Sequence, residues 1–282
     1  MTYQWFPGHM TKAFRMMQED IKLMDLVIEL LDSRIPYASQ NPDIDKLAQG
    51  KARMVILNKA DLADGASTKL WTDHFHDLGY TVVTVNSRTK EGINRIIPSI
   101  QNACKEKIEK DLKKGIKNRP IRAMIVGIPN VGKSTFINSL AGKAAAKTGN
   151  KPGVTKGKQW IRLNKNIELL DTPGVLWPKF EDPVTGRLLA FIGSINDEII
   201  DINELAFDFI EYIKCLKYDY YKMIGDRYGV STDKKSYELI KDIAIERKCL
   251  LKGGEPDVLR ASRLLIDDFR NGKLGEITLE LP

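Results

Sequence analysis

The chain has 282 residues, 43% of them hydrophobic and 29% charged, with a formal net charge of +7, so it is long enough for two globular domains. Its longest run of consecutive apolar residues, 188–192, is far shorter than the roughly twenty residues of a membrane-spanning helix, which argues against a membrane protein. The three cysteines lie far apart without a C-x-x-C pair, and no signal-peptide pattern precedes them, so we expect a cytoplasmic protein without disulfides or zinc.

From the N-terminus to about residue 179, short apolar runs alternate with helix-length amphipathic segments. The runs are rich in aliphatic and β-branched residues, which is typical of buried parallel strands. The alternation predicts an α/β fold with a doubly wound, mostly parallel sheet. The predicted strands, in chain order, are residues 26–31, 54–57, 81–85 and 123–126, followed by a hairpin of residues 159–163 and 167–170.

The pattern changes after residue 179. Apolar residues recur at helical spacing in segments 205–216, 239–250 and 258–269, which predicts a small helical bundle. We therefore expect two domains, residues 1–179 and residues 180–282.

Positive charge is concentrated in the first of these domains. Residues 1–179 hold 29 Lys and Arg against 17 Asp and Glu, whereas residues 180–282 hold 15 against 20. Segment 143–165 has seven basic residues and no acidic one, which favours a polyanionic partner such as RNA. Segment 105–122, with eight basic and three acidic residues, fits a solvated surface equally well.

The most specific motif, Gly127-Ile128-Pro129-Asn130-Val131-Gly132-Lys133-Ser134, matches the P-loop pattern G-x-x-x-x-G-K-[ST] between a predicted strand and a helix. Its glycines allow backbone N–H groups to turn toward phosphate oxygens, and the helix N-terminus adds its dipole. The lysine reaches the β- and γ-phosphates, and the serine hydroxyl can ligate Mg²⁺. The predicted phosphate-binding residues are Asn130, Val131, Gly132, Lys133, Ser134 and Thr135.

A second motif, Asn58-Lys59-Ala60-Asp61, directly follows the predicted strand 54–57. The Asp61 carboxylate can accept both N1–H and the exocyclic amine of guanine, a pairing that adenine does not offer. Asn58 can hydrogen-bond to the base edge while the stem of Lys59 packs along its face. Together with the P-loop, this motif predicts a site for GTP and GDP.

Two further segments complete the predicted pocket. Asn86 and Ser87 follow the predicted strand 81–85, where a third base-contacting loop would lie. In the D-T-P-G segment, Asp171 can hold a magnesium-bound water and the Gly174 N–H can meet the γ-phosphate. Thr155, inside the basic segment 143–165, is either a switch threonine on the Mg²⁺ ion or an ordinary loop threonine.

These motifs resemble those of translation-factor-like GTPases, but their order differs. The usual order is P-loop, switch threonine, D-x-x-G, N-K-x-D and then the serine loop, whereas here N-K-A-D and the Ser87 loop come first. This order is that of a circularly permuted GTPase. With segments 4–10, 32–36 and 152–155, the whole chain resembles the family of bacterial ribosome biogenesis GTPase A, most specifically over residues 1–180.

The resemblance implies a cytoplasmic GTPase that acts late in assembly of the large ribosomal subunit and binds its precursor through rRNA and ribosomal proteins. It also implies a helical domain that touches rRNA, Mg²⁺ as cofactor and K⁺ as activator beside Asn130. We expect a monomer with no membrane association. Because Val175 stands where many GTPases have a water-orienting glutamine, His9 is the candidate catalytic group; packing against Trp5 or contact with RNA is its alternative role.

Two other functions remain open on the sequence alone. One is a P-loop phosphotransferase acting on a small molecule, against which the basic switch segment and the lack of a lid-like sequence argue. The other is a GTPase acting on tRNA or at a membrane, but no basic amphipathic helix or lipidation motif supports the membrane version. In either GTPase, residues 176–180 connect D-T-P-G directly to the helical domain, so ordering of this segment by the γ-phosphate could move that domain.

Overall fold

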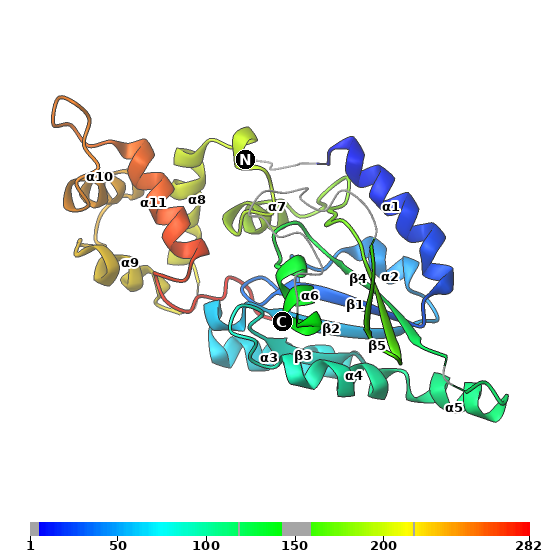
Figure 1. Cartoon of the computed structure of the whole chain (residues 1–282). Coiled ribbons are helices and arrows are strands. Elements are labelled where there is room, and N and C mark those ends of the chain that lie inside the picture. The colour runs from blue at the N-terminus through cyan, green and yellow to red at the C-terminus, as the bar shows by residue number, and fades with distance from the viewer. Residues whose placement is uncertain (1–5, 118, 143–158, 217) are drawn as a thin grey trace.

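A six-stranded sheet forms the centre of the computed structural model, which describes residues 6–117, 119–142, 159–216 and 218–282 (Figure 1). The strand order is β3-β2-β1-β4-β6-β5; every neighbouring pair is parallel except β5 and β6, which form the predicted antiparallel hairpin. The strands are β1 (Leu26–Asp32), β2 (Ala52–Asn58), β3 (Thr81–Val85), β4 (Ile121–Gly127), β5 (Gln159–Asn164) and β6 (Ile167–Asp171).

Helices cover both faces of this sheet, which confirms the doubly wound fold. Trp71 and Phe75 of one helix pack with apolar residues of β1 and β2, while Ile96 and Ile100 of another belong to the larger core, which holds the alternate residues of β2 on the other face. These helices are α1 (Gly8–Asp20), α2 (Pro42–Leu47), α3 (Gly65–Asp77), α4 (Ile96–Ala103), α5 (Lys105–Lys113) and α6 (Lys133–Ala141), with short 3₁₀ turns η1 (Ile21–Leu23), η2 (Ala60–Leu62) and η3 (Ile93–Arg95). Residues 6–171 form what we call the sheet part.

A bundle of helices follows, which confirms the helical bundle predicted after residue 179. Asp182, Asp201 and Asp257 cap the first turns of three of the helices, and each carboxylate accepts hydrogen bonds from backbone N–H groups that the helix itself leaves unpaired. The apolar faces meet at Phe209 and Phe269, whose ring centroids lie 4.6 Å apart. The elements are α7 (Pro183–Phe191), η4 (Asp197–Ile199), α8 (Ile202–Lys214), α9 (Tyr220–Tyr228), α10 (Ser236–Glu246) and α11 (Val258–Arg270). Residues 183–270 form the helical part.

The residues after α11 are not helical and return to the sheet part, as the red segment of Figure 1 shows. The Leu279 N–H donates to the Arg34 carbonyl at 2.8 Å, and the Ile277 N–H donates to the Leu62 carbonyl at 3.1 Å. The indole N–H of Trp71 donates to the Glu280 carbonyl at 3.0 Å. The division into two domains at residue 179 remains a prediction, and its second unit is helical only up to Arg270.

Glu280 makes the attachment of this C-terminal segment pH-dependent. Its carboxylate accepts a 2.9 Å hydrogen bond from the Ala38 N–H, and desolvation raises the pKa of Glu280 from 4.5 to about 7. The folded chain therefore binds a proton here more tightly than the unfolded chain, so stability falls as pH rises from about 4.5 to about 7. We expect Glu280→Gln to shrink the loss of melting temperature between pH 5 and pH 8, whereas the exposed control Glu276→Gln leaves that loss unchanged. An equal loss in both variants would show that Glu280 is not the titrating group.

Candidate functional site

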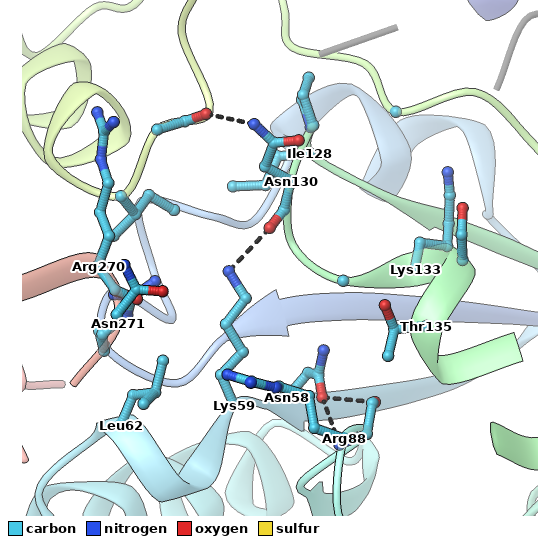
Figure 2. A pocket seen from close by; sticks show the side chains of 18 of the residues that line it. Asn58, Lys59, Leu62, Arg88, Ile128, Asn130, Lys133, Thr135, Arg270 and Asn271 are labelled. Atoms are coloured by element: carbon cyan, nitrogen blue, oxygen red, sulfur yellow. Dashed lines mark hydrogen bonds between the residues drawn. The ribbon is translucent and has the colours of Figure 1, made fainter. Parts of the chain in front are cut away.

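A cavity of about 1030 Å³ opens at the carboxyl ends of the parallel strands, between the sheet part and the helical part. Its size is at the upper end of the range for small-molecule sites. Figure 2 shows Lys133 and Thr135 on one side of it and Arg270 and Asn271 across from them. The predicted residues that line it are Asn58, Lys59, Asp61, Asn86, Ser87, Asn130, Gly132, Lys133, Ser134, Thr135 and Gly174.

The remaining predicted residues lie elsewhere. Ala60 and Val131 belong to the two loops that border the cavity but do not line it, and Asp171 is buried beneath it. His9 is exposed on α1 and does not line the cavity. Thr155 lies outside the described residues.

The phosphate-binding loop has the backbone that its sequence predicts. Strand β4 ends at Gly127 and helix α6 begins at Lys133, so the first N–H groups of α6 are those of the motif. Gly132 has a φ of 96°, and a Cβ there would lie 2.5 Å from Asn58 Nδ2. Asn130 is also left-handed, with a φ of 58°. Glycine at 132 is therefore required both by the turn and by the close approach of the N-K-A-D loop.

Lys133 and Asp171 form a buried pair beside this loop. Lys133 Nζ lies 3.7 Å from Asp171 Oδ1 and donates a hydrogen bond to the Thr172 carbonyl. Asp171 Oδ1 accepts no hydrogen bond from the described residues. Burial lowers the pKa of Lys133 and raises that of Asp171, so each charged form is disfavoured as it stands. A buried carboxylate oxygen in need of a partner, next to a lysine and the Ser134 side of the cavity, fits a magnesium–phosphate ligand.

Lys59 extends across the cavity from the N-K-A-D loop (Figure 2). Its backbone is left-handed, with a φ of 59°, and its ammonium donates to the Asn130 carbonyl at 2.8 Å and pairs with Asp32 at 2.9 Å. Arg34 holds the same carboxylate with two hydrogen bonds of 2.8 Å. Burial alone would raise the pKa of Asp32, but the charges of Arg34 and Lys59 outweigh burial and hold it well below its usual range.

Asp32 and Arg34 therefore also belong to the cavity region, although the sequence motifs assign neither of them a role. Asp32 is the last residue of β1, and Arg34 lines the cavity. The signal that would have found them is their position, because the carboxyl ends of parallel strands converge at one edge of the sheet.

Asn58 connects three loops. Its Oδ1 accepts from the hydroxyl of Ser87 at 2.7 Å and from the Ser87 N–H at 3.3 Å, while its Nδ2 donates to the Val131 carbonyl at 2.8 Å. The prediction gave Asn58 a hydrogen bond to the base edge. In the structure its amide group holds the N-K-A-D loop, the serine loop and the P-loop together, and the hydrogen bond to the base stays a prediction.

The helical part contacts the P-loop directly. Asn130 Nδ2 donates to the Gly193 carbonyl at 2.7 Å, and the Ser194 hydroxyl donates to the Pro129 carbonyl at 2.7 Å (Figure 2 shows the first). Arg270, at the end of α11, holds the end of α7 through hydrogen bonds to the carbonyls of Phe191 and Ala190, and it pairs with Asp197 through both carboxylate oxygens. Movement of the helical part would therefore reach the phosphate loop without passing through residues 176–180.

The helix that carries His9 lies beside the D-T-P-G segment. The Leu176 N–H donates to the sulfur of Met10 at 3.5 Å, so the residue next to His9 contacts the residue next to Val175. Val175 is buried, and its N–H donates to the Gly127 carbonyl at 3.2 Å. The side chain of Val175 has no hydrogen-bonding group, as the sequence predicts. His9 directly precedes Met10, the residue of α1 that contacts this segment.

The strand order, the glycine-dependent phosphate loop and the N-K-A-D loop across the same cavity define a P-loop GTPase with circularly permuted motifs. The family model for 50S ribosome-binding GTPases matches residues 122–215. The chain is 45% identical to ribosome biogenesis GTPase A of Bacillus cereus over its whole length, covering 95% of that protein, and 45% identical to the protein of the same name from Bacillus licheniformis, covering 99% of it. The chain belongs to the ribosome biogenesis GTPase A family.

The structure is similar to that of a solved relative. A GDP-bound structure of TM YlqF aligns with 95% of this chain and 99% of its own, with a TM-score of 0.68 and 28% sequence identity. Membership of a GTPase family sets aside the small-molecule phosphotransferase considered above. Within the described ranges, none of the helices combines the length and apolar character that a membrane span requires.

Proposed function

We propose that this GTPase binds the large ribosomal subunit or its precursor and couples GTP hydrolysis to late assembly of that subunit in the cytoplasm. The observation that carries the proposal is that one cavity is lined by the N-K-A-D loop, the P-loop and the helical part together. A nucleotide in this cavity would contact both parts of the molecule at once. The state of the γ-phosphate can therefore set the position of the helical part, which is how a switch controls a large partner.

The nucleotide would lie with its guanine at Asp61 and the Ser87 loop and its phosphates at the P-loop. Lys133 would exchange the Thr172 carbonyl for the β- and γ-phosphates, and the Gly174 N–H would meet the γ-phosphate. Magnesium, when bound, neutralises charge on these phosphates. The residues proposed to hold it are Ser134, Asp171 and Thr155, and the buried Oδ1 of Asp171, which accepts no hydrogen bond from the described residues, supports this assignment.

Potassium is proposed as an activator at Asn130. The amide nitrogen of this side chain donates a hydrogen bond to the Gly193 carbonyl at 2.7 Å. This bond fixes the direction of the whole amide group, including its oxygen. An amide oxygen is a hard ligand of the kind that alkali and alkaline-earth cations accept. The ion would add positive charge beside the phosphates, where other GTPases use an arginine finger.

The experiment that tests the proposed function is sedimentation of the protein with large ribosomal subunits and their precursors. We expect co-sedimentation with a non-hydrolysable GTP analogue and weaker association with GDP, because the γ-phosphate orders the segments that face the partner. Equal association with both nucleotides, or none with either, would contradict the proposal. The monomeric state and the division at residue 179 are proposed with it.

Association should also fall steeply with salt, because segment 143–165 carries seven basic residues and no acidic one. Replacing Lys156 and Lys158 by alanine should lower the slope of log affinity against log salt by about one to two and leave nucleotide affinity unchanged. The matched control replaces Lys46 and Lys69, which are exposed on α2 and α3. An unchanged slope in the Lys156/Lys158 variant would place the RNA contact on another surface.

A further inference from the structure

A second, smaller cavity lies on the outer strand of the sheet. This groove has a volume of about 290 Å³ and is lined by Arg122, Trp160, Ile161, Arg162 and Glu168. It lies at the hairpin of β5 and β6, and β5 is the last strand of the sheet (Figure 1). None of the predicted nucleotide-binding residues lines it.

Trp160 is the unusual residue of this groove. Its side chain is 44% exposed, whereas the described tryptophans Trp71 and Trp177 are 2% and 9% exposed. An exposed indole on an edge strand loses the burial that normally stabilises a tryptophan. The guanidinium of Arg122 lies over the ring, and the exposed remainder of the indole is available to a ligand that can stack on it.

Basic groups surround the indole. The guanidinium of Arg122 lies 5.5 Å from the Trp160 ring centroid and pairs with Glu168 at 3.3 Å. Arg162 is exposed two residues along β5, on the same face as Trp160, and donates only to the Asn164 carbonyl among the described residues. An aromatic face with guanidinium groups beside it suits a nucleobase followed by its phosphate.

The positive surface continues beyond the groove onto α5. The Ile121 N–H donates to the Asn166 carbonyl at 2.8 Å, and Arg119 contacts Asp111 of α5 at 3.4 Å, so the turn of the hairpin lies beside the end of this helix (Figure 1). The lysines of this region are exposed and have no ion pair with another described residue. They are Lys113, Lys114, Lys117 and Lys165.

We infer that this groove binds a single-stranded segment of RNA, with one base stacked on Trp160 and the phosphates that follow it held by Arg162 and by Lys113, Lys114, Lys117 and Lys165. The inference deepens the proposed function and rests on it for the source of the RNA. Charge complementarity selects RNA as the occupant, because Arg162 and four exposed lysines that form no ion pair among the described residues outnumber the carboxylate of the groove, Glu168, which pairs with Arg122. A protein partner would need an acidic surface that also offers a flat ring.

The register of the hairpin connects the groove to the GTPase centre. Trp160 pairs with Leu170, and Gln159 pairs with Asp171, the carboxylate next to Lys133. RNA that fixes β5 therefore also fixes the strand that ends in the D-T-P-G segment. Occupancy of the groove should raise GTP turnover on the particle.

The test uses the exposed indole as its own reporter. The full chain is titrated at increasing salt with a dye-labelled oligouridylate of about twelve nucleotides; tryptophan fluorescence reports stacking, and the anisotropy of the dye reports affinity in every variant. We expect quenching in the parent protein, loss of that quenching in Trp160→Phe with affinity largely kept, and affinity about 5- to 150-fold weaker in Trp160→Ala. Arg162→Ala should lower the salt slope by about one. The matched control is Tyr237→Ala, because Tyr237 is 50% exposed on α10.

Unchanged affinity in Trp160→Ala, or quenching by an acidic peptide but not by the oligonucleotide, would overturn the inference. Because Trp160 is outside the nucleotide cavity, its variants should keep the GTP turnover of the free protein, and this rate also reports folding. If Trp160→Ala still sediments with large subunits as the parent does, the groove is not the RNA site and the proposed function stands. If the parent never sediments with subunits but binds the oligonucleotide through Trp160, the proposed function fails, and the inference that the groove binds single-stranded RNA is supported.

Discussion

Asp61→Asn should weaken GTP binding by about 10²- to 10⁴-fold and improve binding of xanthosine triphosphate. The carboxylate would accept two hydrogen bonds from guanine, each assisted by its charge, and the amide keeps only one oxygen and presents an N–H₂ to the other donor. Xanthine has an oxygen where guanine has its exocyclic amine, so the same N–H₂ becomes a partner. Nucleotide titrations with GTP, ATP and xanthosine triphosphate measure the change.

The matched control for this variant is Asp73→Asn, since Asp73 is exposed on α3 and does not line the cavity. Its GTP affinity should equal that of the parent. If the parent itself binds ATP and GTP equally, the assignment of the N-K-A-D loop to the base is wrong, whatever the variant does.

His9→Ala should remove most of the hydrolysis that ribosomal subunits stimulate, by about 10²- to 10⁴-fold, while GTP binding and particle association persist. Val175 offers no hydrogen bond to the attacking water, and His9 adjoins the residue whose sulfur contacts Leu176. His9 does not line the cavity in the free chain, so α1 must move for it to act and unstimulated turnover should be slow. Single-turnover hydrolysis with saturating subunits, with the exposed His76→Ala as control, measures the effect.

The same assay, run in potassium and again in sodium, examines the ion proposed at Asn130. Faster hydrolysis in potassium would support a potassium ion at Asn130. Equal rates in the two salts would contradict that proposal. Equal rates for His9→Ala and the parent would exclude His9 as the group that orients water.

The parts of the site that local sequence could predict are those whose chemistry is confined to a few consecutive residues. The P-loop depends on the backbone freedom of Gly132 and on the helix that starts at Lys133, and both are visible in the sequence. The sheet followed in the same way from runs of aliphatic residues, which became the mostly buried strands β1, β2 and β4 and the partly buried strand β3. Even the hairpin at β5 and β6 was marked by a polar turn between two short apolar runs.

The contacts between distant segments could not be predicted in this way. Asn130 meets Gly193, and Arg34 meets the carbonyl of Arg270, but no local pattern specifies either pair. Asn58 shows the same limit, because its hydrogen bonds to Val131 and Ser87 join loops that lie far apart in the sequence. Helix α9 was missed because aromatic and charged residues, rather than aliphatic ones, form much of its sequence.

The C-terminal segment that bonds to Leu62 and Arg34 also governs the timing of folding. Residues 277–280 are separated from their partners by more than two hundred positions, so the loop that they close is among the last to form. On the ribosome that makes this chain, the strands and the P-loop emerge and can pair first, while the stretch after the N-K-A-D motif gains these partners only once residues 277–280 have been made. The cavity, which Arg34 and Leu62 line, is therefore completed only after the helical part has been made. A chain that is still being translated does not yet have the complete cavity.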